Sequence, residues 1–126
     1  MTPAALTLND VSATAWQPLC QRADLVAFSG VVAWIDAPQG EPCQIALFYL
    51  PGQMPELYAL DHFDPFSNAF VIGRGIVGDI DAEPVIASPL YKQHFRLSDG
   101  QCLEDESVKL RTWPVRLEND CVLIKP

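Results

Sequence analysis

The sequence of 126 residues predicts an all-β domain, an antiparallel sandwich or small barrels with at most one short helix. Short runs of apolar or β-branched residues recur along the chain, and turn-forming residues separate them. Eleven prolines argue against long helices, because proline breaks a helix interior. The runs that predict strands are residues 16–20, 30–35, 43–50, 57–60, 69–72, 85–87, 94–97, 113–117 and 121–124.

The ends of the domain are set by where these runs begin. Residues 1–15 are rich in Ala and Thr with little periodicity, which predicts a loosely ordered extension before a single domain at 16–126. They also lack the basic start and apolar stretch of a secretory signal. The longest apolar run, 45–50, is far short of the roughly 20 residues that cross a bilayer. We therefore expect no membrane span and a cytoplasmic protein.

The third run carries the predicted core. Residues 44–50 are apolar at nearly every position, which is typical of a strand that other layers cover on both faces. Prolines and a glycine between 38 and 42 separate it from the preceding run, and Pro51 and Gly52 end it.

Two local features follow in the second half of the chain. Asp99-Gly100 predicts a two-residue hairpin turn, with a positive φ at Gly100, between residues 94–97 and a strand that starts near Cys102. Residues 103–110, with acidic side chains near their start, are the one candidate helix.

A glycine pattern at residues 73–78 has the G-x-G-x-x-G spacing of dinucleotide-binding folds. That pattern binds a pyrophosphate only where its last glycine opens a helix. Here an acidic stretch at 79–83 and then Pro84 follow. We interpret the segment as a glycine-rich β loop.

Charge excludes another class of partner. Sixteen acidic and eight basic side chains give a net charge of −8, and the basic residues are spread along the chain. A phosphate backbone would be repelled, so no nucleic-acid partner is expected.

The reactive side chains do not assemble into a recognisable site. His62 and His94 have no Cys, His or carboxylate partner at a metal-binding spacing, so we expect surface or hydrogen-bonded histidines. No residue is marked as a nucleophile, and no catalytic or metal site is expected. No two cysteines form a C-x-x-C pair, and reduced Cys packs as a small apolar residue. The four cysteines are Cys20, Cys43, Cys102 and Cys121.

From residue 57 to 124 the order of elements resembles the Rieske domain. In that family a Cys-x-His loop and a later Cys-x-x-His loop hold a [2Fe–2S] cluster. Here Tyr58-Ala59-Leu60-Asp61 leads into Asp64-Pro65-Phe66, and Val85-Ile86-Ala87 leads into Ser88-Pro89-Leu90-Tyr91. The resemblance implies that poor iron–sulfur ligands replace all four donors, and hence that the chain holds no cluster. The replacing residues are Asp64, Phe66, Ser88 and Tyr91.

Residues 86–105, together with 64–75, resemble the small subunit of NADH-dependent assimilatory nitrite reductase, over about residues 16–124. The resemblance implies a cofactor-free subunit that is not catalytic by itself. Its partner would be a large subunit that carries FAD, an iron–sulfur cluster and sirohaem, binds NADH and reduces nitrite to ammonium. Two other classes stay open, a stand-alone small-molecule-binding β domain and an assembly factor for a redox enzyme.

The same resemblance implies a contact surface at the two former ligand loops. Aromatic and apolar groups beside a few charged ones are typical of such a contact, so Phe66→Ala and Tyr91→Ala are expected to weaken binding and leave the domain folded. These aromatics could instead fill the space left by the cluster. The candidate contact residues are Phe63, Asp64, Pro65, Phe66, Leu90, Tyr91, Lys92 and His94.

Overall fold

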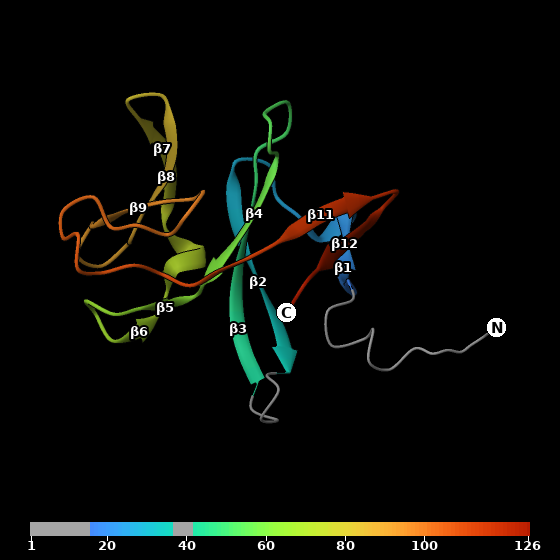
Figure 1. Ribbon diagram of the computed structural model, residues 1–126, viewed down its shortest axis with the longest axis horizontal. Helices are drawn as coiled ribbons and strands as arrows, with labels where there is room; N and C mark the ends of the chain where they lie inside the picture. Colours follow the sequence, from blue (N-terminus) through green and yellow to red (C-terminus); the bar gives the residue numbers. More distant parts are fainter. Residues whose placement is uncertain (1–15, 37–41) are drawn as a thin grey trace.

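A computed structural model describes residues 16–36 and 42–126, so the predicted extension at 1–15 lies outside the described residues. The all-β prediction is confirmed, since the described chain forms four antiparallel sheets and two short 3-10 turns (Figure 1). None of its helices is long and apolar enough to cross a membrane. The strands are β1 (Gln17–Gln21), β2 (Ser29–Asp36), β3 (Pro42–Tyr49), β4 (Leu57–Asp61), β5 (Phe63–Asp64), β6 (Ala69–Phe70), β7 (Ile76–Ile80), β8 (Glu83–Ala87), β9 (His94–Arg96), β10 (Thr112–Trp113), β11 (Val115–Glu118) and β12 (Cys121–Ile124), and the 3-10 turns are η1 (Arg22–Asp24) and η2 (Ile72–Arg74).

Strand β3 lies at the centre of the molecule, as its apolar run predicts. It pairs with β2 and β4 in the sheet β10-β4-β3-β2, and residues 45–48 are almost completely buried. Ile45 and Leu47 belong to one core cluster, which the sheet β1-β12-β11 also lines. Ala46 and Phe48 belong to a second cluster on the other face, shared with β8 and β9. Because side chains alternate along a strand, one continuous apolar run serves both cores.

The second core supports the end of the molecule that carries the candidate site. The sheet β7-β8-β9 and the hairpin β5-β6 lie together on the side of Figure 1 opposite β1, β11 and β12. Ile86 and Phe95 are fully buried there against β3 and β4. The loops that follow β5 and β8 therefore lie next to a fully buried core.

Glycines allow two close approaches near this core. A Cβ on Gly75 would lie 2.1 Å from the carbonyl oxygen of Ala87, and one on Gly30 would lie 2.5 Å from that of Gly73. Gly73 falls in η2, and β7 starts at Ile76 and pairs with β8. Residues 73–78 thus form the end of a 3-10 turn and the start of a strand, where a glycine-rich β loop was predicted, and Gly73 and Gly75 lie close to neighbouring backbone.

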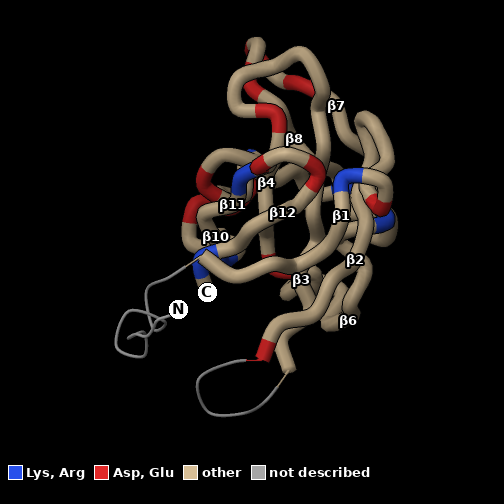
Figure 2. Tube along the Cα trace, turned by 90° about the vertical axis from the view of Figure 1, so that its right-hand side faces the viewer, with Lys and Arg blue, Asp and Glu red and all other residues tan. Residues whose placement is uncertain are grey.

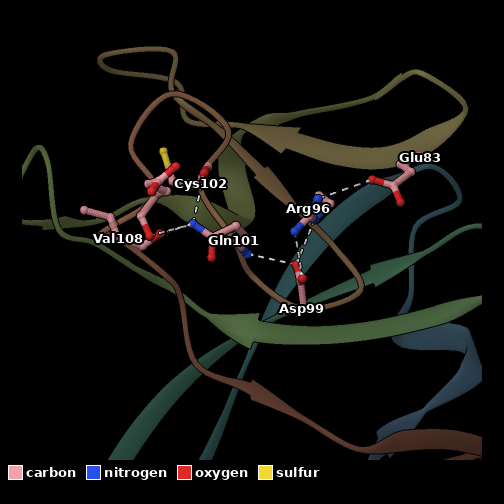
Figure 3. Close-up of polar contacts among 7 residues, drawn as sticks. Glu83, Arg96, Asp99, Gln101, Cys102 and Val108 are labelled. Atoms are coloured by element: carbon pink, nitrogen blue, oxygen red, sulfur yellow. Dashed lines mark hydrogen bonds and ion pairs between the residues drawn. The ribbon is translucent and has the colours of Figure 1, made fainter.

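The predicted helix at 103–110 is wrong, since these residues form turns and an isolated bridge. The Gln101 side-chain amide donates to three backbone carbonyls, those of Cys102, Glu106 and Val108, at 3.1, 3.2 and 3.0 Å (Figure 3). Asp105 Oδ1 accepts the Ser107 N–H at 3.0 Å, closing a side-chain turn. Such bonds offer the backbone an alternative to the helix, and this loop adopts it.

The hairpin around Gly100 differs from the two-residue turn that was predicted. Gly100 has the expected positive φ of 78°, but four residues, 97–100, connect Arg96 to Gln101, whose carbonyl accepts the Arg96 N–H at 2.9 Å. Arg96 also binds both carboxylate oxygens of Asp99, at 3.1 and 3.0 Å, and lies 3.7 Å from Glu83 (Figure 3). The ion pair between Arg96, at the end of β9, and Asp99, in the loop, favours the longer turn. Beyond it, Cys102 forms only an isolated bridge with Phe95.

Gly100→Ala is expected to lower the free energy of unfolding by about 2 kcal/mol. The positive φ disfavours alanine, and a Cβ at this position would lie 2.2 Å from the Leu110 carbonyl oxygen. Urea unfolding measures the change, with Gly52→Ala as the matched control. Gly52 also has a positive φ, 88°, but nothing lies within 4 Å of its Cβ position. Equal losses for both variants would contradict the role assigned to Leu110.

Candidate partner-binding site

The two loops that the resemblance aligns with the Rieske ligand loops, residues 64–68 and 88–93, are joined by a buried hydrogen bond. Asp64 at the end of β5 is fully buried, and Ser88 directly after β8 is 1% exposed. The Ser88 hydroxyl donates to Asp64 Oδ2 at 2.5 Å. We call residues 64–68 and 88–93 the tip loops.

The same two residues shape each tip loop locally. Asp64 Oδ1 accepts the Phe66 N–H at 2.9 Å, and the Asp64 carbonyl accepts the Asn68 N–H at 2.8 Å. Ser88 donates its N–H to Gln93 and accepts that of Lys92 at its carbonyl. Aspartate is typical of such turns, because its short polar side chain reaches the nearby backbone, whereas Ser88 shapes its loop through backbone bonds. Asp64 and Ser88 thus anchor the two tip loops.

The aromatic residues at the tip are placed differently from one another. Phe66 is half-buried against the second core, with its ring centroid 6.1 Å from that of Phe95. Tyr91 is 63% exposed and Leu90 is 53% exposed. Phe66 therefore fills interior space, as one of the two suggested roles requires, whereas Tyr91 is at the surface and stays a candidate contact residue.

The other candidate contact residues are also sorted by burial. Pro65 and Lys92 are exposed, and Asp64 is buried, so its side chain cannot contact a partner directly. Phe63 is half-buried and packs edge-to-face on Phe70 at 5.1 Å.

His94 is held by Glu104, a partner that sequence reasoning missed. Glu104 accepts the His94 backbone N–H at 2.8 Å and lies 2.7 Å from His94 Nδ1. Burial raises the pKa of the Glu104 carboxyl, but the hydrogen bonds from His94 outweigh this and leave the pKa below 4.5. The two residues are ten apart with a loop between them, so no local sequence pattern marks the pair.

The donor set at the tip does not fit a [2Fe–2S] cluster. Asp64 and Ser88 already satisfy one another, Phe66 has no donor atom, and Tyr91 is exposed to solvent. Cluster ligands in this fold are two thiolates and two imidazoles. Among the described residues there is no group of three or more His, Cys, Asp or Glu side chains placed to hold a metal ion. All four cysteines are free thiols, and Cys102 is buried.

His62 is the hydrogen-bonded histidine that the sequence predicts. It is 3% exposed, and its Nδ1 accepts the Gly73 N–H at 2.9 Å. Burial lowers the pKa of its imidazole below 6.5, and the positive charge of Arg74 adds to this, against a smaller opposing effect of Asp61. His62 therefore anchors η2 to β4 in its neutral form.

Mild acid is expected to destabilise the domain through His62. The pKa of His62 is lower in the folded state than in the unfolded state, where it is about 6.5. The stability that neutral His62 contributes is therefore complete above pH 6.5 and is lost as the pH falls below that value. Urea unfolding at pH 7.5, 6.5 and 5.5, about one unit on each side of that pKa, measures the loss. His62→Gln keeps a neutral acceptor and should flatten this dependence, with His94→Gln as the control. An unchanged slope in His62→Gln would contradict the assignment.

Comparison with known proteins identifies the family. The family described as Rieske-like [2Fe-2S] domain matches residues 15–125. The nitrite reductase (NADH) small subunit of Salmonella typhimurium is 36% identical over 110 residues, which cover 87% of this chain and 96% of that protein. The NMR structure of the E. coli protein NirD superposes with a TM-score of 0.76 at 31% identity, covering 89% of this chain and 96% of that one.

A further relative is a much longer protein. The nitrite reductase [NAD(P)H] large subunit of Klebsiella oxytoca is 40% identical over 109 residues, which are 86% of this chain and 11% of that protein. This chain thus spans about a tenth of the large relative and nearly all of the small ones. By fold and by sequence, the chain belongs to the Rieske-like domain family and, within it, to the small subunits of NADH-dependent nitrite reductase, an oxidoreductase.

Proposed function

We propose that this chain is the cofactor-free small subunit of a cytoplasmic NADH-dependent nitrite reductase. In this proposal it supports the reduction of nitrite to ammonium by a large subunit that carries FAD, sirohaem and an iron–sulfur cluster. The observation that carries the proposal is the double occurrence of the domain among its relatives. It is found as a separate small subunit in Salmonella typhimurium and inside a large subunit in Klebsiella oxytoca. Because the domain occurs both as a separate subunit and within a large one, we infer that it functions in contact with the large subunit.

The absence of a cofactor is supported by the chemistry of the tip. Asp64 and Ser88 form the bond that joins the two tip loops, and the resemblance to Rieske domains aligns these two residues with the cysteine ligands. In our proposal the domain keeps the Rieske scaffold and uses it to present a surface to its partner.

That surface includes the tip loops. Tyr91 and Leu90 expose apolar area beside Pro65 and Lys92, and the Asp64–Ser88 bond keeps the loops in one arrangement. A rigid, partly aromatic surface favours binding, because little side-chain and loop freedom is lost on association. Two further side chains near this surface are held in place, because His94 is hydrogen-bonded to Glu104 and Phe66 packs on the second core.

Removing and restoring the chain tests the proposal. The cognate large subunit, purified with its cofactors, should reduce nitrite with NADH only after this chain is added, and the two should elute as one complex. Full activity of the large subunit alone would contradict the subunit role. If the chain is needed only while cofactors are inserted, activity should persist after the chain is removed, which would favour an assembly factor.

A small-molecule-binding domain is the weaker alternative. A hollow between the start of β2 and the β7-β8 hairpin is lined by Phe28, Gln53, Val77 and Asp79, among others. Among the described residues that line it, Asp79 is the only charged one, whereas a specific ligand site needs several convergent polar groups.

A further inference from the structure

A strip of exposed apolar side chains runs beside the tip and has no role in the fold described so far. Val32, Trp34 and Phe70 are 40, 58 and 52% exposed, and Phe63 is half-buried under Phe70. Most exposed apolar residues need no explanation, but a contiguous group that contains Trp and Phe is typical of an interface. We call Val32, Trp34, Phe63 and Phe70 the aromatic strip.

Contacts connect the members of the strip. Phe70 packs on Phe63 and lies 6.4 Å from the buried His62 ring, which accepts the Gly73 N–H. A Cβ on Gly73 would lie 3.2 Å from Val32, so η2 joins the β5-β6 hairpin to β2.

Trp34 extends the strip along β2. It follows Val32 by two residues on the same face, because side chains alternate along a strand. It is paired with Gln44, whose carbonyl accepts the His62 N–H. The opposite face of β2, with Val31, Ala33 and Ile35, packs into the first core, so the exposure of Val32 and Trp34 is specific to this side.

The composition of the strip suits a protein partner. None of its four members is charged, although the chain has a net charge of −8, and the exposed Arg74 lies next to Gly73 at its border. Figure 2 shows that acidic residues are frequent along the β7-β8 hairpin and around β11 and β12. At the end of β2, Asp36 is exposed on the same face as Trp34 and borders the strip there. Interface centres are likewise depleted of charge and enriched in aromatic residues.

The area needed for a stable complex argues that the tip alone is too small. Specific interfaces bury about 800 Å² and about 20–30 residues on each partner. The tip loops are two short segments, and Asp64 and Ser88 in them are buried. The interface must continue onto adjoining surface, and the β5-β6 hairpin connects the first tip loop, residues 64–68, to the paired residues Phe63 and Phe70.

We infer that the aromatic strip is the second half of the large-subunit interface, continuous with the tip. This inference rests on the proposed function, because it assigns the large subunit as the occupant. The tip loops and the strip then form one surface on which Tyr91 and Trp34 are the exposed anchors.

Binding measurements with the purified cognate large subunit test this. Trp34→Ala and Phe70→Ala, made in the full chain, should each raise the Kd by about 30-fold, with thermal unfolding checking that each variant is folded. Ile80→Ala is the matched control. It removes an exposed apolar side chain from the far end of the β7-β8 hairpin and should change the Kd less than about twofold.

The outcomes separate the inference from the proposed function. Normal binding by the folded strip variants, with weakened binding by Tyr91→Ala, would overturn the strip and leave the subunit role intact. No binding by the unaltered chain would overturn the proposed function and the strip with it. A dimer of the chain alone that Trp34→Ala dissociates would show that a second copy covers the strip, which also overturns the inference.

Discussion

Asp64→Ala is expected to lower the free energy of unfolding by about 3 kcal/mol. The carboxyl group is fully buried and accepts hydrogen bonds from the Ser88 hydroxyl and the Phe66 N–H. Alanine removes both acceptors, leaves the buried Ser88 hydroxyl and the partly buried Phe66 N–H without partners, and opens a small cavity. Urea unfolding monitored by circular dichroism measures the loss.

A double-mutant cycle tests whether the bond between the loops causes this loss. Ser88→Ala should cost about 1–2 kcal/mol, and the double variant should cost less than the sum of the single ones, because the two residues share one hydrogen bond. Asp64→Asn keeps one carbonyl acceptor and should be milder than Asp64→Ala. Additive losses would mean that Asp64 stabilises only its own turn and that the tip loops are held together by other contacts.

Tyr91→Ala is expected to raise the Kd for the large subunit by about 30-fold and to lower NADH-dependent nitrite reduction at limiting chain concentration. Tyr91 is 63% exposed, so its truncation should change the free energy of unfolding by less than about 0.5 kcal/mol. Because the defect lies in association, excess variant chain should restore the activity. Titration of the large subunit with the chain, followed by activity, measures both effects.

Phe66→Ala should behave differently, although the resemblance to Rieske domains aligns both residues with histidine ligands. Its ring packs on Phe95 and the second core, so truncation should cost about 2 kcal/mol of stability. Any loss of binding by Phe66→Ala therefore includes a folding effect, and the expectation that it leaves the fold unchanged is revised. Normal binding by Tyr91→Ala would place the contact away from the second tip loop.

Much of the fold could be predicted from the sequence, because strand patterns reflect burial. The run at 44–50 predicts a strand buried on both faces, and β3 has that environment. The strands that were missed are short or irregular in composition. β5 has two residues, and β7 contains Gly78 and Asp79, which are uncommon in strands. The run at 113–117 is divided at Pro114, which has no N–H for a continuous ladder.

Loop geometry was harder to predict, because it depends on individual side-chain contacts that residue propensities do not describe. The segment at 103–110 is a loop because the Gln101 side chain binds its carbonyls, and the hairpin at Gly100 is longer because Arg96 pairs with Asp99 within it. Neither helix propensity nor the Asp-Gly signal takes account of the Gln101 hydrogen bonds or of the Arg96–Asp99 ion pair.

The positions at the tip were predictable only through the resemblance to Rieske domains. The motif places Asp64 and Ser88 where cysteine ligands would stand, but it does not indicate that the two residues bind each other. Asp64 is fully buried and so does not belong to the candidate contact surface. The pattern of polar and apolar residues did not indicate this burial.

The iron and sulfide content of the chain tests the cofactor-free proposal most directly. The chain should be purified without oxygen from iron-sufficient cells and then added to the cognate large subunit. We expect less than about 0.1 iron per chain and full restoration of NADH-dependent nitrite reduction, whereas a Rieske cluster requires about two irons. About two irons per chain, or activity restored only by an iron-loaded chain, would contradict the account.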